Sequence, residues 1–208
     1  MNKFERENVQ DVYNQIYKEF DYSRYYIWPS VKKFLENIPK YSVICDIGCG
    51  NGKNMMHLNN DYLFIGADFS EQLLNICSKK KLEVCVANNC ILPFKDNSFD
   101  CALSIAVIHH CSSYKLRLKA LEEIIRITKP NCNIMVQVWA FEREYCKKFD
   151  TQDAIIPWKT KTQTYNRYYY LFKENELDNM IKNTKYNIKI IKSYKERDNY
   201  IIIFNKLL

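Results

Sequence analysis

The stretch VICDIGCGNGKN, residues 43–54, holds three of the four glycines in a chain of 208 residues. An average composition would give about 15 glycines in a chain of this length, so glycine is concentrated where bare backbone is needed. The β-branched start of the stretch predicts a buried strand over 43–47, and residues 53–59 predict a short helix. A strand, a glycine turn and a helix form the unit in which backbone closely approaches a nucleotide.

A second predicted strand ends in an acidic residue, and its spacing in sequence from the glycine loop is informative. The segment YLFIGADFS, residues 62–70, predicts a strand that ends at Asp68, 20 residues after Gly48. At that spacing, a carboxylate at the tip of the second strand accepts hydrogen bonds from ribose hydroxyls. Together the two elements predict a nucleotide-cofactor site.

The glycine loop departs from the dinucleotide fingerprint, which needs a glycine where Lys53 stands. Its pattern is G-x-G-x-G, with Asp46 two residues ahead of the first glycine. A carboxylate at this place would repel a pyrophosphate, but it suits a ligand with an ammonium group. The alternative is that Asp46 only caps backbone amides at the strand end.

Outward from the loop, strand and helix patterns alternate along the chain. This order predicts an α/β fold with a central, mostly parallel seven-stranded sheet and helices on both faces. The expected strands are residues 43–47, 62–68, 83–87, 99–107, 134–140, 188–193 and 200–205. The expected helices are residues 5–20, 29–37, 53–59, 70–80, 115–128 and 174–183. The last two strands should pair antiparallel because they lie close together in sequence.

The length predicts a single domain over residues 1–208. Within it, residues 1–42 should form a helical N-terminal cap. Residues 91–98 predict a loop. Residues 141–170 show no clean period, so we expect an irregular, substrate-facing segment there.

Composition indicates an intracellular globular protein. Hydrophobic residues make up 47% and charged residues 26% of the chain, and no apolar run is long enough to span a membrane. The polar N-terminus does not resemble a signal peptide. Nine cysteines without a C-x-x-C pair, and only three histidines, predict reduced thiols and no metal site.

The net charge of +7 is unevenly distributed. Residues 141–208 carry 14 basic and 9 acidic side chains, which accounts for most of the excess. A basic C-terminal region suits a polyanionic partner such as RNA. A lysine-rich solvated surface would give the same count, and charge alone leaves both readings open.

The glycine motif resembles motif I of the Rossmann-like S-adenosylmethionine methyltransferases. More specific blocks resemble one family of them, the eukaryotic tRNA methyltransferases that esterify the carboxymethyl group on the wobble uridine. The blocks are FDYSRYYIWP (20–29), CDIGCGNGK (45–53), SIAVIHH (104–110), IPW (156–158) and RYYYLFKENEL (167–177). They lie in the family's order and span most of the chain.

This resemblance implies S-adenosyl-L-methionine as cofactor and assigns site residues. The implied cofactor contacts are Asp46, Gly48, Gly50, Gly52, Asp68, Asn88 and Ala106. The implied catalytic or substrate-clamping residues are Arg24, His109, Arg117 and Arg167, while His110 is interpreted as structural. The aromatic residues expected to stack anticodon bases are Tyr25, Trp28, Trp139, Trp158 and Tyr168.

Each assignment has a structural alternative. An arginine in a tyrosine-rich run is often a surface stacker, and a tryptophan beside proline is often a packing residue. Asn88 stands where the family has an acid that faces the adenine amino group, and Pro130-Asn131-Cys132 replaces glycines usual before the fifth strand. The segment ahead of residues 156–158 is also shorter than is common in the family.

The family works on the tRNA anticodon loop with a small zinc-ribbon activator subunit. The resemblance implies that this activator adds a strand beside residues 83–87, with cytoplasm, or cytoplasm and nucleus, as the expected location and no membrane partner. Two other hypotheses stay open. One is a methyltransferase of a small metabolite, and the other is a module that binds the cofactor without turnover.

Overall fold

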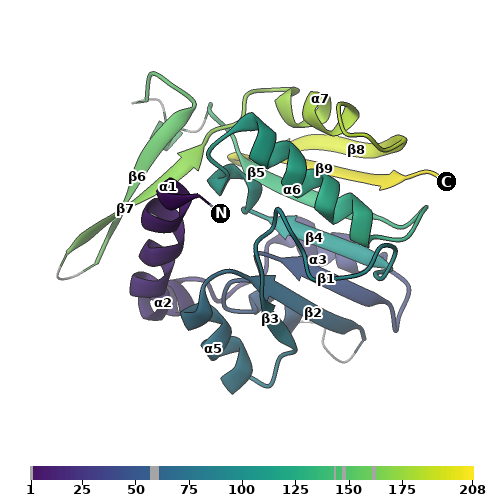
Figure 1. Ribbon diagram of the computed structural model, residues 1–208, viewed down its shortest axis with the longest axis horizontal. Coiled ribbons are helices and arrows are strands. Elements are labelled where there is room, and N and C mark those ends of the chain that lie inside the picture. Colours follow the sequence, from purple (N-terminus) through teal and green to yellow (C-terminus); the bar gives the residue numbers. More distant parts are fainter. Residues whose placement is uncertain (1, 57–60, 143, 147–148, 161–162) are drawn as a thin grey trace.

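The computed structural model describes residues 2–56, 61–142, 144–146, 149–160 and 163–208. Seven strands form one sheet in the order β3-β2-β1-β4-β5-β9-β8 (Figure 1). The strands are β1 (Val43–Ile47), β2 (Leu63–Asp68), β3 (Val84–Val86), β4 (Cys101–Ile105), β5 (Ile134–Trp139), β8 (Ile188–Glu196) and β9 (Asn199–Lys206). β1 to β5 run parallel, whereas β9 is antiparallel to both β5 and β8. The predicted sheet is confirmed.

Helices cover both faces of the sheet. They are α3 (Pro29–Leu35), α4 (Lys53–Met56), α5 (Glu71–Lys79), α6 (Tyr114–Ile127) and α7 (Glu176–Lys182). Buried residues of α6 and α7 join one hydrophobic core, and those of α3 and α5 join a second core across the sheet. Figure 1 shows α6 in front of the sheet and α3 behind it. The helix predicted at 53–59 is described only to Met56.

The N-terminal cap is helical, as predicted, but it contains a π-helical stretch. α1 (Lys3–Glu5), the π-helix Arg6–Gln10 and α2 (Asp11–Ser23) follow each other without a break. The buried side chains of Val9, Val12 and Ile16 tie this cap to the rest of the molecule. No helix in the described ranges is long and apolar enough to cross a membrane.

The prediction that residues 141–170 are irregular is wrong. A two-stranded antiparallel hairpin of β6 (Asp153–Lys159) and β7 (Thr164–Tyr170) lies there, and in Figure 1 it stands beyond α1 and α2 at the left. Ala154, Ile156 and Tyr169 pack into a small core of its own. The sequence gave no strand signal here because the buried part of β7 is the consecutive run Arg167, Tyr168 and Tyr169, which includes a charged residue and does not alternate.

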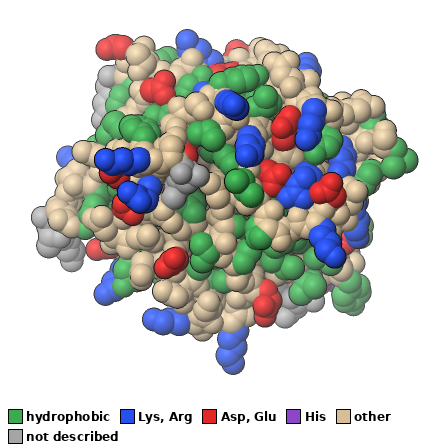
Figure 2. Space-filling model, viewed as in Figure 1, with side chains coloured by type: hydrophobic (Ala, Val, Ile, Leu, Met, Phe, Trp, Pro, Cys, Tyr) green, Lys and Arg blue, Asp and Glu red, His purple; other side chains and the backbone are tan. Residues whose placement is uncertain are grey.

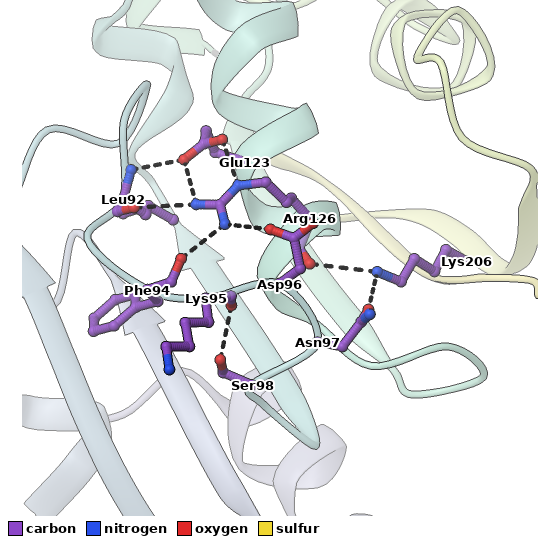
Figure 3. Close-up of polar contacts among 9 residues, drawn as sticks. All are labelled: Leu92, Phe94, Lys95, Asp96, Asn97, Ser98, Glu123, Arg126 and Lys206. Atoms are coloured by element: carbon purple, nitrogen blue, oxygen red, sulfur yellow. Dashed lines mark hydrogen bonds and ion pairs between the residues drawn. The ribbon is translucent and has the colours of Figure 1, made fainter.

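The loop predicted at residues 91–98 is bound to the C-terminal half of α6 by one arginine (Figure 3). The Arg126 guanidinium donates to the carbonyls of Leu92 and Phe94, and it pairs with Asp96 and Glu123. Glu123 also accepts the Leu92 N–H at 2.7 Å. These contacts hold the chain on its way into β4, whose far end borders the site described next.

Candidate active site

A cavity of about 570 Å³ opens at the carboxyl ends of the parallel strands, where ligands bind in open α/β sheets. Its floor is the glycine loop after β1, together with Asp68 at the end of β2 and Ala106 after β4. α2 and the segment 24–29 form one wall, and Arg167 and Tyr169 of the hairpin form another. Its size suits a ligand of nucleoside dimensions.

The glycines of the loop serve two different purposes. All three have positive φ, at +70° for Gly48, +57° for Gly50 and +76° for Gly52. A Cβ on Gly48 would lie 2.2 Å from a methyl of Val107, so packing alone demands glycine there. A Cβ on Gly50 would instead face the Phe20 ring at 3.3 Å, on the cavity side. Bare backbone at Gly50 therefore keeps room for a ligand.

Asp68 lines the cavity and is held in place by backbone. Its Oδ2 accepts the Gly50 N–H at 2.9 Å, and its Oδ1 accepts the Ser70 N–H at 2.8 Å. Burial raises the pKa of this carboxyl, although these hydrogen bonds oppose the rise. Each oxygen retains a second acceptor position, so Asp68 can receive ribose hydroxyls.

Asp46 lies fully buried beneath the loop. Its Oδ2 accepts from the Asn54 side chain at 3.2 Å, whereas its Oδ1 has no hydrogen-bond partner among the described residues. Burial raises the pKa of Asp46 to about 7, against the effect of the Asn54 hydrogen bond. An unsatisfied buried carboxylate oxygen is costly, and a nearby ammonium group would offset that cost. Asp46 lies behind the residues that line the cavity, so the two carboxylates, Asp68 at the cavity and Asp46 beneath it, fit a cationic nucleoside such as S-adenosylmethionine.

The predicted contact Asn88 does not line the cavity. Its side chain accepts the Cys90 N–H at 2.9 Å in a local turn. Its neighbour Asn89 instead lines a narrow recess beside Asp68, together with Phe69 and Leu92. The sequence motif could not distinguish Asn88 from Asn89, because the turn at Asn88 decides which of the two side-chain amides faces the recess.

Ala106 lies at the cavity with φ of +62°, in the left-handed region that side chains other than glycine seldom adopt. Its N–H is donated to the Gln137 carbonyl at 2.9 Å, which holds the turn against β5. The strand predicted over 99–107 therefore ends at Ile105, and the chain turns into a 3₁₀ helix at Ile108–His110.

Arg167 is a buried cation at the cavity without an acidic partner. It is 4% exposed, and no described carboxylate lies within ion-pair distance of it. Its Nη1 donates to the hydroxyl of Tyr169 at 2.9 Å and to that of Tyr13 at 3.4 Å, while its Nε has no partner among the described residues. A desolvated guanidinium in this state is suited to an anionic ligand.

A second arginine faces the same space. The Arg24 and Arg167 guanidinium carbons lie 5.3 Å and 4.7 Å from the centre of the Trp158 ring, so both groups contact the same indole. Arg24 is partly exposed, and its guanidinium donates to the Ser23 carbonyl. Lys53 adds a third positive charge, and burial, followed by repulsion from Arg24, lowers its pKa to about 8. The mouth of the cavity is therefore cationic.

The positions of the two histidines are the reverse of those predicted from the sequence. His109 is fully buried behind the cavity, where its Nδ1 accepts the Trp139 N–H and its ring stacks on Tyr169. His110, interpreted as structural, lines the cavity instead. Its Nδ1 lies 2.8 Å from the Tyr168 carbonyl and must donate to it, so its Nε2 accepts from Tyr13. Burial lowers the pKa of His110 to about 3, which keeps it neutral.

Arg117 lies away from the cavity in the described structure. It is buried, donates to the Cys111 carbonyl at 2.9 Å and places its guanidinium 3.4 Å from the centre of the Tyr170 ring. These contacts hold α6 against the end of β7, so Arg117 has a structural role in the described fold.

The predicted aromatic residues divide into two groups. Tyr25, Trp28 and Trp139 line the cavity. Trp158 does not line the cavity but contacts Phe20, Arg24 and Arg167, which do. Tyr168 packs against Phe4 and donates its hydroxyl to Asp153. Cavity residues that the sequence did not single out include Tyr13, Phe20, Lys53, His110, Tyr169 and Arg197. They come from five separate segments of the chain, and a helical or strand pattern does not show which of its side chains face a distant cavity.

Solved structures of low sequence identity share this fold. A Methanosarcina mazei S-adenosylmethionine-dependent methyltransferase superposes with a TM-score of 0.71 at 20% identity, covering 88% of this chain and 99% of that one. A Haloferax volcanii methyltransferase, solved with the Trm112 methyltransferase activator, gives 0.71 at 15% identity, with 97% and 99% covered. The methyltransferase domain family also matches residues 45–136. The fold and the cavity define a Rossmann-like methyltransferase.

Curated relatives narrow the class. The Schizosaccharomyces pombe tRNA (carboxymethyluridine(34)-5-O)-methyltransferase is 34% identical over 98% of each chain, so the chain belongs to the family of tRNA (carboxymethyluridine(34)-5-O)-methyltransferases. The enzymes of that name from Xenopus tropicalis and Arabidopsis thaliana are 31% and 45% identical over 98% and 68% of this chain. The chain spans only 41% and 35% of their lengths.

Proposed function

We propose that the protein transfers a methyl group from S-adenosylmethionine to the carboxylate of 5-carboxymethyluridine at the tRNA wobble position, giving the methyl ester. The observation that carries this proposal is Arg167, a buried guanidinium at the cavity with no acidic partner among the described residues. A substrate carboxylate supplies the missing charge. The family membership, through the relative that matches over 98% of both chains, supports the same substrate.

The chemistry needs no general base. A carboxyl group with a pKa near 4 is already ionised at neutral pH, so a carboxylate oxygen can attack directly. When bound, S-adenosylmethionine supplies an electrophilic methyl group on a positively charged sulfur. The neutral His110 therefore needs to remove no proton, and it serves to hold Tyr13, which in turn contacts Arg167.

The protein contributes orientation and exclusion of water. Arg24 and Arg167, which line the same cavity and both contact Trp158, would clamp the carboxylate, because a guanidinium can hold a carboxylate with two hydrogen bonds. Asp68 would receive the ribose hydroxyls, and Asp46 would face the ammonium end of the cofactor. Orientation of this kind supplies several kcal/mol, up to about 7–11 kcal/mol in well-aligned cases.

We also propose that a small zinc-ribbon activator adds a strand beside β3. β3 is an edge strand of the sheet, and Val86 on it is 56% exposed. A partner strand would satisfy its open backbone groups. The Haloferax volcanii neighbour solved with an activator is consistent with such a partner. The nine cysteines, none in a disulfide, fit a reducing compartment, and we propose the cytoplasm.

The test is a methyl-transfer assay with methyl-labelled S-adenosylmethionine, the activator and tRNA that carries 5-carboxymethyluridine at the wobble position. We expect label in the tRNA that mild base releases, because an ester is hydrolysed and a methylated base or ribose is not. The same tRNA with plain uridine at that position is the control. Label that stays on the RNA after base treatment, or no label at all, would remove the proposal.

A further inference from the structure

Three tyrosines lie exposed within five residues at the rim of the cavity. Tyr22, Tyr25 and Tyr26 are 92%, 64% and 81% exposed, and Tyr25 and Tyr26 line the cavity itself. The ring centres of Tyr25 and Tyr26 are 5.3 Å apart, edge to face. Within the described residues neither ring contacts a further aromatic ring, so the fold makes little use of these rings.

The segment that presents these rings is firmly held despite their exposure. Buried Asn51, in the glycine loop, donates from its side chain to the Arg24 carbonyl at 3.0 Å and to Asp21 at 2.8 Å. Lys80 pairs with the same Asp21 at 2.8 Å and donates to the Asn51 carbonyl at 3.1 Å. The tyrosines are thereby placed at a set position relative to the cofactor loop.

The charge around the rings points to a polyanion. Arg24 stands directly before the pair, and Lys53 and Arg197 line the same cavity. Aromatic rings beside cations form the usual surface for single-stranded nucleic acid, because bases stack on the rings while the cations hold the phosphates. A target base inside the cavity would leave its neighbours in the strand at this rim.

We propose that Tyr25 and Tyr26 form a stacking platform for the nucleotides that flank the modified uridine. This inference rests on the proposed function and extends it, because it assigns Tyr26 a role that no motif gave it. It also separates two tasks. The arginines bind the reacting group, whereas the tyrosines grip the neighbouring RNA and set the affinity for the loop.

The experiment measures binding of a fluorescent anticodon stem-loop RNA that carries 5-carboxymethyluridine, by anisotropy, with S-adenosylhomocysteine present. Loss of one stacked base corresponds to roughly 5- to 150-fold weaker binding, and we expect Tyr26→Ala and Tyr25→Ala to fall in that range. Tyr26→Phe should stay within about threefold, because the phenyl ring still stacks. Tyr41→Ala is the matched control, since Tyr41 is 84% exposed and does not line the cavity.

The outcomes separate this inference from the function on which it rests. Unchanged RNA binding by both alanine variants would overturn the platform but leave the methyltransferase proposal in place. The same holds if the variants lose the activator instead of the RNA. Failure of the unaltered protein to bind any anticodon stem-loop would overturn both. The circular dichroism spectrum and thermal midpoint of each variant, expected to match those of the unaltered protein, show that each is folded.

Discussion

At the scale of single residues, Arg167 points to a binding site because its buried charge has no acidic partner among the described residues. Its guanidinium is buried, hydrogen-bonded to tyrosine hydroxyls and close to the Trp158 ring, yet it faces no described carboxylate. Removing a charge from water costs several kcal/mol, and those contacts offset only part of that cost. Under the proposed function, the substrate carboxylate would supply the missing partner.

This gives the first prediction. Replacing Arg167 by methionine removes an uncompensated buried charge, so the thermal midpoint of the ligand-free protein should stay level or rise by a few degrees. Methyl transfer to tRNA should fall at least 100-fold, because the clamp on the carboxylate is gone, with unchanged affinity for S-adenosylhomocysteine. Calorimetry and the transfer assay measure both. A lower midpoint would show that Arg167 stabilises the fold itself.

The second prediction concerns the pH dependence of Asp46. Its pKa of about 7 in the folded chain lies above the ordinary value near 4. Between these values the folded protein holds a proton that the unfolded chain has released, so the free energy of unfolding falls as pH rises from 4 to 7. Cofactor affinity should have the opposite pH dependence, because the ammonium group of the cofactor favours the ionised form of Asp46. Affinity for S-adenosylhomocysteine should rise up to about tenfold per pH unit below 7 and then level off.

Calorimetric titrations from pH 5.5 to 7.5 measure this profile. The range ends there because burial lowers the pKa of Lys53, in the same cavity, to about 8. Asp46→Asn should bind more weakly at pH 7.5 and show a flat profile. A flat profile in the unaltered protein would mean that Asp46 does not face the ammonium group.

At the scale of elements, the hydrogen bonds between β2 and the edge strand β3 show which backbone groups of β3 face outward. Ala87 donates its N–H to the Asp68 carbonyl, and Gly66 donates to the Glu83 carbonyl. Because backbone groups alternate along a strand, the N–H of Val86 points away from β2, toward the place of an added strand. Proline is tolerated at such a position, since no hydrogen bond to β2 is lost.

The third prediction follows from that direction. Val86→Pro should leave the fold and cofactor affinity intact but weaken binding of the activator at least tenfold, because one donor is lost and the ring obstructs a partner strand. Val86→Ala removes most of the side chain but keeps the N–H, and it should bind within a few-fold of the unaltered protein. Equal binding by both variants would place the activator elsewhere.

The hairpin of β6 and β7 explains why one element escaped prediction. In the sequence TYNRYYY, Arg167 and Tyr169 point inward and are buried, although neither reads as a core residue. Strand periodicity is recognised when apolar side chains face a core. Here Tyr168, between them, is buried as well, so three consecutive residues are buried and no two-residue alternation marks the strand.

At the scale of the whole molecule, the basic side chains that give the net charge of +7 are interspersed with acidic ones. Figure 2 shows basic, acidic and apolar side chains interspersed on the face that carries α6, without a field of one sign. Among the described residues that line the cavity, four are cations, Arg24, Lys53, Arg167 and Arg197, against the single carboxylate of Asp68. RNA contact is therefore expected at the cavity mouth rather than across the helical face shown.

The fourth prediction tests this partner by salt. Binding of an anticodon stem-loop should weaken roughly 10- to 100-fold between 50 and 200 mM salt, as expected for three or four phosphate contacts. Affinity for S-adenosylhomocysteine should change less than twofold over the same range. Affinity for RNA that is indifferent to salt would favour a small metabolite as the substrate instead.

What the sequence determined by itself was local. The glycine turn between 43–47 and Lys53, the acid at Asp68, and the alternation that builds the sheet all depend on neighbours within a few residues, which a linear pattern records. Tertiary structure alone decided that His110 rather than His109 lines the cavity and that Asn89 rather than Asn88 lines the recess. Those choices depend on contacts such as Tyr13 with His110 and with Arg167, 97 and 154 residues apart, which no local periodicity encodes.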